Sequence, residues 1–160
     1  MTLYIKQKVF SWADKFTVKD ADGVDKYRVE GEVFTIGRKL HVYDNSEREV
    51  IFIKERLTFF MPTFEIYIDG TLVGEVKREF TFFHPRYTVS LLDGRTVEVE
   101  GDFWDHDYSV TEGTRTLMAV SKEFFTWGDS YALNVYNGED EKLGLAIVLA
   151  IDCVLASQNN

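Results

Sequence analysis

The sequence of 160 residues contains only one cysteine, Cys153, and this scarcity excludes two classes of site. A single thiol cannot build a disulfide framework, and it cannot supply a cysteine-rich metal site. The N-terminal stretch "MTLYIKQKVFSW" also lacks the continuous apolar segment of a secretory signal peptide, because Lys6 and Lys8 interrupt it. These features predict a cytoplasmic protein in a reducing compartment.

Positive charge is also in short supply, with 18 Lys and Arg residues against 27 Asp and Glu residues and a formal net charge of -9. Nucleic acids and anionic membranes attract proteins through an excess of positive charge. We therefore expect no nucleic-acid partner and no bulk attraction to an anionic lipid surface. A phosphorylated ligand would need a local group of cations.

Catalytic motifs are absent as well. The sequence contains no nucleophile elbow, no P-loop and no dinucleotide-binding fingerprint. The histidines, His41, His84 and His106, do not have the spacing of metal ligands. We therefore predict a protein that is not an enzyme and that has no catalytic residue, no metal site and no cofactor.

The densest polar cluster, "GDFWDHDYS", leaves one alternative open. Asp105 and Asp107 share a face if this segment is a strand, and carboxylates of this kind suit a hard cation. A metal-dependent hydrolase centred on them is the less favoured hypothesis. A solvated hairpin end explains the same residues without any metal.

No hydrophobic run is long enough to cross a bilayer, which takes about 20 apolar residues in a helix. The longest, residues 143–156, also contains Asp152. We predict a helix over residues 141–156, with Asp140 as its N-cap, and no transmembrane segment. Because this helix is apolar on every face, the rest of the protein must surround it.

The residues before this helix alternate between apolar and polar side chains in short runs, as β-strands do. Asp-Gly pairs at 69–70 and 93–94 indicate hairpin turns. About a dozen such runs follow one another without a linker, so we predict a single domain over residues 1–160. The predicted fold is mainly β, a closed antiparallel barrel around a central C-terminal helix.

Asp152 needs a partner if its helix is buried, because an unpaired buried carboxylate is very costly. Arg78 shares a strand face with Val76 and is one candidate, which would make Asp152 and Arg78 structural buried polar residues. Tyrosine hydroxyls or backbone amides are the alternative.

Candidate ligand-binding residues are Lys54 and Arg56, which share one strand face, together with Lys77. A lysine and an arginine placed in this way can grip a phosphate, since arginine supplies a fork of donors and lysine a point charge. The alternative is an ordinary solvated strand face with ion pairs to neighbouring glutamates. The aromatic stretches "TFFMPTF" and "FTFF" favour core packing over a stacking platform for nucleic acid.

Five stretches of the sequence resemble the LURP-one-related family of the Tubby C-terminal-like superfamily. They are "LYIKQKVFSWADKFTVKDADG", "YRVEGEVFTIGRKLHVYD", "IKERLTFFMPTFEIYIDG", "VSKEFFTWGDSYALNV" and "GLAIVLAIDCVLA". The resemblance covers nearly the whole chain and implies a barrel of about twelve strands around a hydrophobic C-terminal helix.

The resemblance implies a binding or scaffold module for a phosphorylated lipid head group or a protein partner, because Tubby domains bind phosphoinositides. The C-terminal helix is also similar to that of phospholipid scramblases, which implies a membrane-associated alternative. This chain departs from both patterns. It is acidic where Tubby domains are basic, and only "NGEDEK" stands where scramblases have a calcium-binding segment.

Overall fold

The fold is seen in a computed structural model, which describes residues 1–6, 15–32, 36–58, 61–79, 81, 83–123 and 130–158. Within these residues, twelve strands precede a single-turn 3-10 helix and one α-helix. The strands are β1 (Thr2–Lys6), β2 (Lys15–Lys19), β3 (Asp25–Gly31), β4 (Lys39–Tyr43), β5 (Glu49–Arg56), β6 (Thr63–Ile68), β7 (Thr71–Glu79), β8 (Arg86–Leu91), β9 (Thr96–Asp102), β10 (Asp107–Glu112), β11 (Arg115–Glu123) and β12 (Ser130–Val135). The helices are η1 (Gly138–Asp140) and α1 (Glu141–Gln158).

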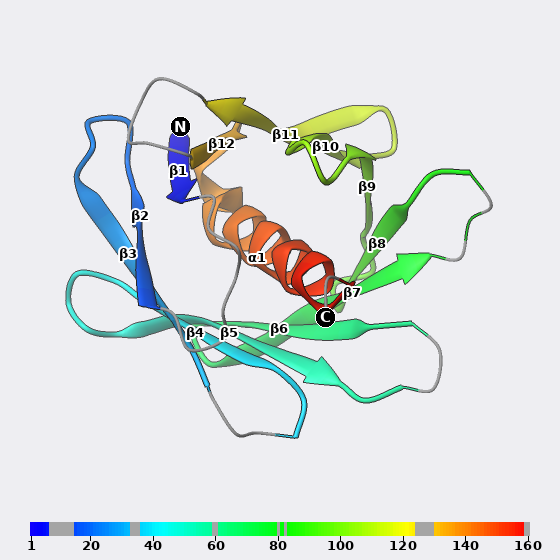
Figure 1. Cartoon of the computed structure of the whole chain (residues 1–160), viewed down its shortest axis with the longest axis horizontal. Coiled ribbons are helices and arrows are strands. Elements are labelled where there is room, and N and C mark those ends of the chain that lie inside the picture. Colours follow the sequence, from blue (N-terminus) through cyan, green and yellow to red (C-terminus); the bar gives the residue numbers. More distant parts are fainter. Residues whose placement is uncertain are drawn as a thin grey trace.

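The strands form one closed barrel in which each strand pairs in antiparallel fashion with its neighbours in the sequence. The barrel closes where β1 pairs with β12, with Thr2 opposite Asn134 and Lys6 opposite Ser130. Helix α1 lies across the interior (Figure 1). The fold class predicted from the sequence is confirmed.

Alternating side chains explain why these segments form a barrel wall. In β8 and β9, for example, Val89, Val97 and Val99 are fully buried, whereas the residues between them along β9 are exposed. The Asp-Gly turns are also where the sequence predicts them. Gly70 and Gly94 have φ values of 82° and 95°, which a residue without a side chain adopts easily.

The predicted helix begins at the expected residue and extends two residues further, to Gln158. Its start differs from the prediction in one respect. Asn137, rather than Asp140, supplies the capping side chain, which accepts a hydrogen bond from the Glu139 amide at 3.3 Å. The cap lies earlier because the turn η1 starts the helical backbone three residues before α1.

Helix α1 fills the barrel. Seven consecutive residues, from Leu145 to Ile151, are completely buried. Close approach of the wall is visible at Gly144, where a Cβ atom would lie 2.5 Å from the Met118 sulfur. Among the described residues, no helix combines the length and the apolar character needed to span a bilayer.

A partly buried ion pair links the start of α1 to the wall of the barrel. The Glu141 carboxylate accepts a hydrogen bond from the Tyr27 hydroxyl at 2.8 Å and pairs with the Lys26 ammonium at 2.8 Å. The last turns of α1 lie at the opposite end of the barrel. At this end β1, β3, β5, β7, β9 and β11 each connect to the next strand, and we call it the long-loop end. There the Arg38 guanidinium donates to the Cys153 carbonyl oxygen at 2.8 Å.

Candidate functional site

Inside the barrel, Asp152 is held by groups from the wall. The Tyr131 hydroxyl donates a hydrogen bond to Asp152 Oδ2, and His106 Nε2 lies 3.6 Å from Oδ1. Arg78 is half-buried and lies opposite Tyr87 in the pairing of β7 with β8. Among the described residues it makes no ion pair with Asp152, so the expected pairing is not found and the tyrosine alternative is. Asp152 is 13% exposed.

His106 reaches this position through an unusual turn between β9 and β10. Its φ is 50°, a left-handed conformation that non-glycine residues seldom adopt. The turn is preceded by Gly101, whose φ of 144° and contact with the backbone of β10 leave no room for a side chain. The imidazole ring then stacks on Tyr131, with the ring centres 4.2 Å apart. The alternation of apolar and polar residues in the sequence does not predict that His106 points into the barrel.

Burial and the nearby Asp152 carboxylate raise the pKa values of the surrounding phenols. The pKa of Tyr87 is raised to about 12, and those of Tyr108 and Tyr131 are raised well above 10. Each phenol therefore remains neutral at physiological pH, and the Tyr131 hydroxyl is the one that donates to Asp152. This arrangement holds α1 in the barrel, and in the described part of the chain no three His, Cys, Asp or Glu residues gather as metal ligands.

On the outside of the barrel, the structure brings together the cations singled out in the sequence. Lys54 and Arg56 are both exposed on the same face of β5. Arg56 is opposite Thr63 on β6, and Thr63 is opposite Lys77 on β7, so the two cations stand in one row across three strands. We call Lys54, Arg56 and Lys77 the cation patch.

The patch is only partly neutralised by its neighbours. Arg56 pairs with Glu75 at 3.1 Å, and both side chains are partly exposed. Within the described residues, Lys54 and Lys77 have no carboxylate at ion-pair distance. Lys54 lies between Lys39, its cross-strand neighbour on β4, and Glu65, its cross-strand neighbour on β6. The like charge of Lys39 destabilises the pairing, and the opposite charge of Glu65 offsets this only in part.

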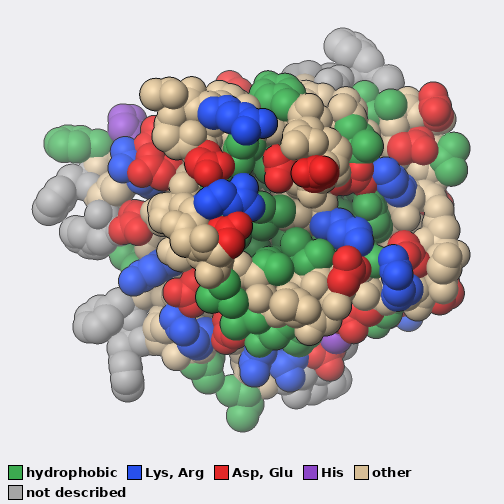
Figure 2. Space-filling model, turned by 180° about the vertical axis from the view of Figure 1, so that it is seen from behind, with side chains coloured by type: hydrophobic (Ala, Val, Ile, Leu, Met, Phe, Trp, Pro, Cys, Tyr) green, Lys and Arg blue, Asp and Glu red, His purple; other side chains and the backbone are tan. Residues whose placement is uncertain are grey.

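Large apolar side chains are exposed beside the patch, at the long-loop end. Leu57, which directly follows Arg56, is 66% exposed. Phe83, between β7 and β8, is 90% exposed, and Ile36, before β4, is 86% exposed. Phe83 belongs to the stretch "FTFF", which the sequence interpretation assigned to core packing, and no role was assigned to Leu57 and Ile36. Phe59, Phe60, Phe80 and Phe82 of the aromatic stretches lie outside the described residues. Figure 2 shows charged side chains of both signs on one face of the molecule, with hydrophobic side chains reaching the surface between them.

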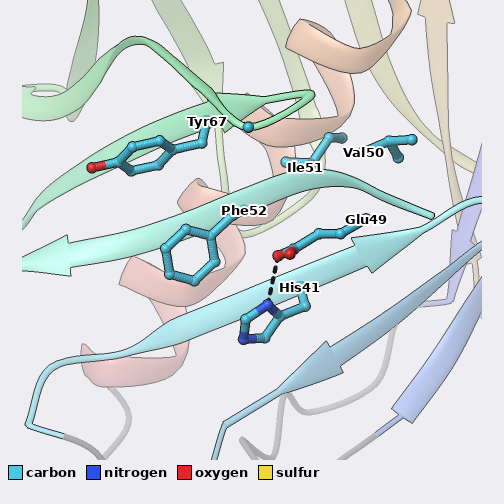
Figure 3. Close-up of a pocket in the computed structure, with 7 residues that line it drawn as sticks. His41, Glu49, Val50, Ile51, Phe52 and Tyr67 are labelled. Atoms are coloured by element: carbon cyan, nitrogen blue, oxygen red, sulfur yellow. Dashed lines mark hydrogen bonds and ion pairs between the residues drawn. The ribbon is translucent and has the colours of Figure 1, made fainter.

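A groove of about 240 Å³ lies further along the same strands (Figure 3). His41, Phe52 and Tyr67 line it from β4, β5 and β6, and Glu49 closes one side. The ring centres of His41 and Phe52 are 4.9 Å apart, and those of Phe52 and Tyr67 are 5.5 Å apart. We call these four residues the aromatic groove.

Comparisons with known proteins identify the family of the chain and relatives in other organisms. The family model described as LURP-one-related matches residues 1–152. A Bacillus subtilis protein named "Uncharacterized protein YxjI" is 37% identical over 153 residues, which cover 96% of this chain and 93% of that protein. The crystal structure of an Arabidopsis thaliana protein superposes with a TM-score of 0.67 at 18% identity, covering 95% of this chain and 90% of that one, which shows a shared fold. The chain therefore belongs to the LURP-one-related family.

Proposed function

We propose that this protein is a non-enzymatic binding module that recognises a phosphorylated lipid head group at the cation patch. One observation carries the proposal: two lysines without carboxylate partners among the described residues and one arginine gather on a single exposed face, in a chain whose net charge is -9. An anion bound there would further offset the repulsion between Lys39 and Lys54, which Glu65 on β6 already reduces.

The chemistry of the patch suits a phosphate. Arg56 can offer parallel N–H groups to two phosphate oxygens, and the lysines add compact positive charges. Its pair with Glu75 does not prevent this, because exposed ion pairs contribute little and exchange readily. The exposed Leu57 next to the patch favours a ligand with an apolar part, such as a lipid, over a free phosphate.

The position of α1 supports an outer site. Because the helix occupies the barrel interior, a ligand has to bind on the outer surface. The same packing weighs against the scramblase-like alternative, since α1 would have to leave the barrel to enter a bilayer and expose its buried apolar surface to water on the way. The hydrolase alternative has less support, because Asp105 and Asp107 are exposed on a turn and at a strand start.

The proposal is tested by titrating the purified protein with soluble phosphorylated head groups, namely phosphocholine, phosphoethanolamine, glycerol phosphate and an inositol phosphate, and following amide chemical shifts. At least one should bind at low salt, and binding should weaken as salt is added. The Lys54→Gln/Arg56→Gln variant should bind about tenfold more weakly.

A matched control removes the same charge elsewhere. Lys6 and Arg115 are exposed on β1 and β11, on other parts of the barrel, and the Lys6→Gln/Arg115→Gln variant should bind like the wild type. If no head group binds at low salt, or if both double variants lose affinity equally, the cation patch is not the site.

A further inference from the structure

We propose that the cation patch and the aromatic groove together take the zwitterionic head group of a choline phospholipid in a bilayer. Lys54 and Arg56 bind its phosphate, and the groove binds its trimethylammonium group. This inference rests on the proposed function and goes beyond it by naming the class of lipid.

The order of side chains along β5 carries the inference. From the long-loop end, the exposed positions are apolar at Leu57 and cationic at Arg56 and Lys54. They are followed by the half-buried aromatic ring of Phe52 and the exposed carboxylate of Glu49. A choline phospholipid has the complementary order of acyl chain, phosphate and trimethylammonium. Phe52 and Lys54 lie two residues apart on one face of the strand, about 7 Å at the usual rise. That spacing is comparable to the distance that the four covalent bonds between the phosphorus and the nitrogen of the head group can span.

The aromatic groove has the composition of a site for an organic cation. Rings from three adjacent strands stand side by side, and the faces of aromatic rings attract cations. A trimethylammonium group has no N–H donor, so it is recognised by ring faces and by charge rather than by hydrogen bonds. A groove with few polar donors and acceptors is therefore suited to it.

Charge in the groove points to a cation as well. The two ring nitrogens of His41 face two carboxylates, Glu49 at 2.6 Å and Glu32 at 3.3 Å. Even a doubly protonated imidazole would offset only one of these two negative charges. Glu49 lines the groove and Glu32 lies beside it, so the charge around His41 favours a cationic ligand over an anionic one.

On the neighbouring surface, a cation of the chain already contacts the face of an aromatic ring. Arg28 lies over the ring of Tyr43, 4.8 Å from its centre, and pairs with Glu30 at 3.1 Å and Glu47 at 2.7 Å. An aromatic ring flanked by carboxylates thus binds a cation of the chain itself. Among the described residues, no lysine or arginine takes the equivalent place over Phe52.

Two β-bulges shape the floor of the groove. The pairing of β4 with β5 skips Val50, because Val42 is opposite Ile51 and Tyr43 is opposite Glu49. The pairing of β6 with β7 shifts in the same way next to Tyr67. Bulges bend strands and redirect side chains, and they are frequent near functional sites. Here they flank β5 and β6 on either side of the hollow.

The net charge of the chain favours binding to a zwitterionic lipid over binding to an anionic lipid. A protein with a charge of -9 is repelled by an anionic membrane at long range. A zwitterionic head group has no net charge, so this repulsion does not arise. The exposed Leu57, Phe83 and Ile36 at the long-loop end would then contact the acyl region, with the cation patch at the level of the phosphates.

The test compares phosphocholine with phosphoethanolamine, inorganic phosphate and choline chloride, by calorimetry or amide chemical shifts. Phosphocholine should bind about fivefold more tightly than phosphoethanolamine, because only its trimethylammonium group exploits the ring faces. Phe52→Leu, which keeps apolar volume but removes the ring, and Glu49→Gln, which removes the charge, should each abolish that preference. Tyr4→Leu, on the outer face of β1, is the matched control and should retain it.

A second experiment tests whether the protein recognises the head group as part of a membrane lipid. Wild-type protein should float with phosphatidylcholine vesicles and less with phosphatidylglycerol vesicles, and Leu57→Ser/Phe83→Ser should lose flotation while still binding soluble phosphocholine. Binding of phosphocholine without flotation would overturn the lipid assignment. If all phosphorylated head groups bind equally, and Phe52→Leu and Glu49→Gln change nothing, the choline inference is wrong while the cation patch stands. If no phosphorylated group binds, both proposals are wrong.

Discussion

The Tyr131 hydroxyl of β12 donates a hydrogen bond to the Asp152 carboxylate of α1 inside the barrel. This contact joins the last strand to the only α-helix among the described residues, and His106 stacks on the same tyrosine. It answers why an acidic residue interrupts the most apolar stretch of the chain. Asp152 links the far half of α1 to the wall, as Glu141 links its start.

We expect Tyr131→Phe to lower the free energy of unfolding by about 2 kcal/mol, since it removes a partly buried hydrogen bond to a charged group. Arg78→Met should cost less, because Arg78 makes no ion pair with Asp152 within the described structure. Urea denaturation of both variants measures the difference. A larger loss for Arg78→Met would show that the arginine, not the tyrosine, is the main support of Asp152.

Truncation of the chain before Leu143 should leave a protein that does not fold. The helix supplies the centre of the core, with seven consecutive completely buried residues, and nothing else would fill that space. Circular dichroism and solubility of the truncated chain check this. A folded, soluble barrel without α1 would contradict the role of the helix as the core.

The free energy of unfolding should fall as the pH rises above about 10. Burial raises the pKa of Tyr87 to about 12, whereas an unfolded tyrosine titrates near 10. Below pH 10 both states keep the proton and the contribution to stability is complete; between pH 10 and 12 only the folded state holds it, so stability is lost. The pKa values of Tyr108 and Tyr131 are also raised by burial and contribute to the loss in the same direction.

Urea midpoints at a series of pH values from 8 to 12 measure this decline. Tyr87→Phe is the informative variant, because it removes one of the titrating groups and should make the decline shallower. A stability that stays constant across this range would contradict the buried, neutral state of the phenols.

Gly101→Ala should destabilise the protein by more than about 2 kcal/mol. Its φ is 144°, and a Cβ atom would lie 2.5 Å from both the Asp107 carbonyl oxygen and the Tyr108 Cα atom, which are backbone atoms that cannot easily move. Gly94→Ala is the control, since its φ of 95° is also unfavourable but nothing lies within 4 Å. Thermal unfolding should show a clearly smaller loss for the control, about 1 kcal/mol. Equal losses would mean that backbone conformation alone, without the contact, explains the need for glycine.

Much of the fold could be predicted from the sequence because it depends on local patterns. Alternation with a period of two residues identifies strands whatever they pair with, and Asp-Gly turns such as 69–70 mark where consecutive strands turn back. A helix that is apolar on every side, yet too short to span a membrane, has to be enclosed. These features together lead to a barrel around α1.

The partners of individual residues were decided only by the tertiary structure. Alternation tells which side of the wall a side chain faces, but the register between strands and the bulge at Val50 decide which outward residues meet. His41, Phe52 and Tyr67 are therefore ordinary strand residues in the sequence and become one groove only in the barrel. In the same way, the burial of the helix was enough to predict that Asp152 needs a partner. The choice of Tyr131 over Arg78 depended on which wall strand α1 approaches, and that follows from packing across the whole interior.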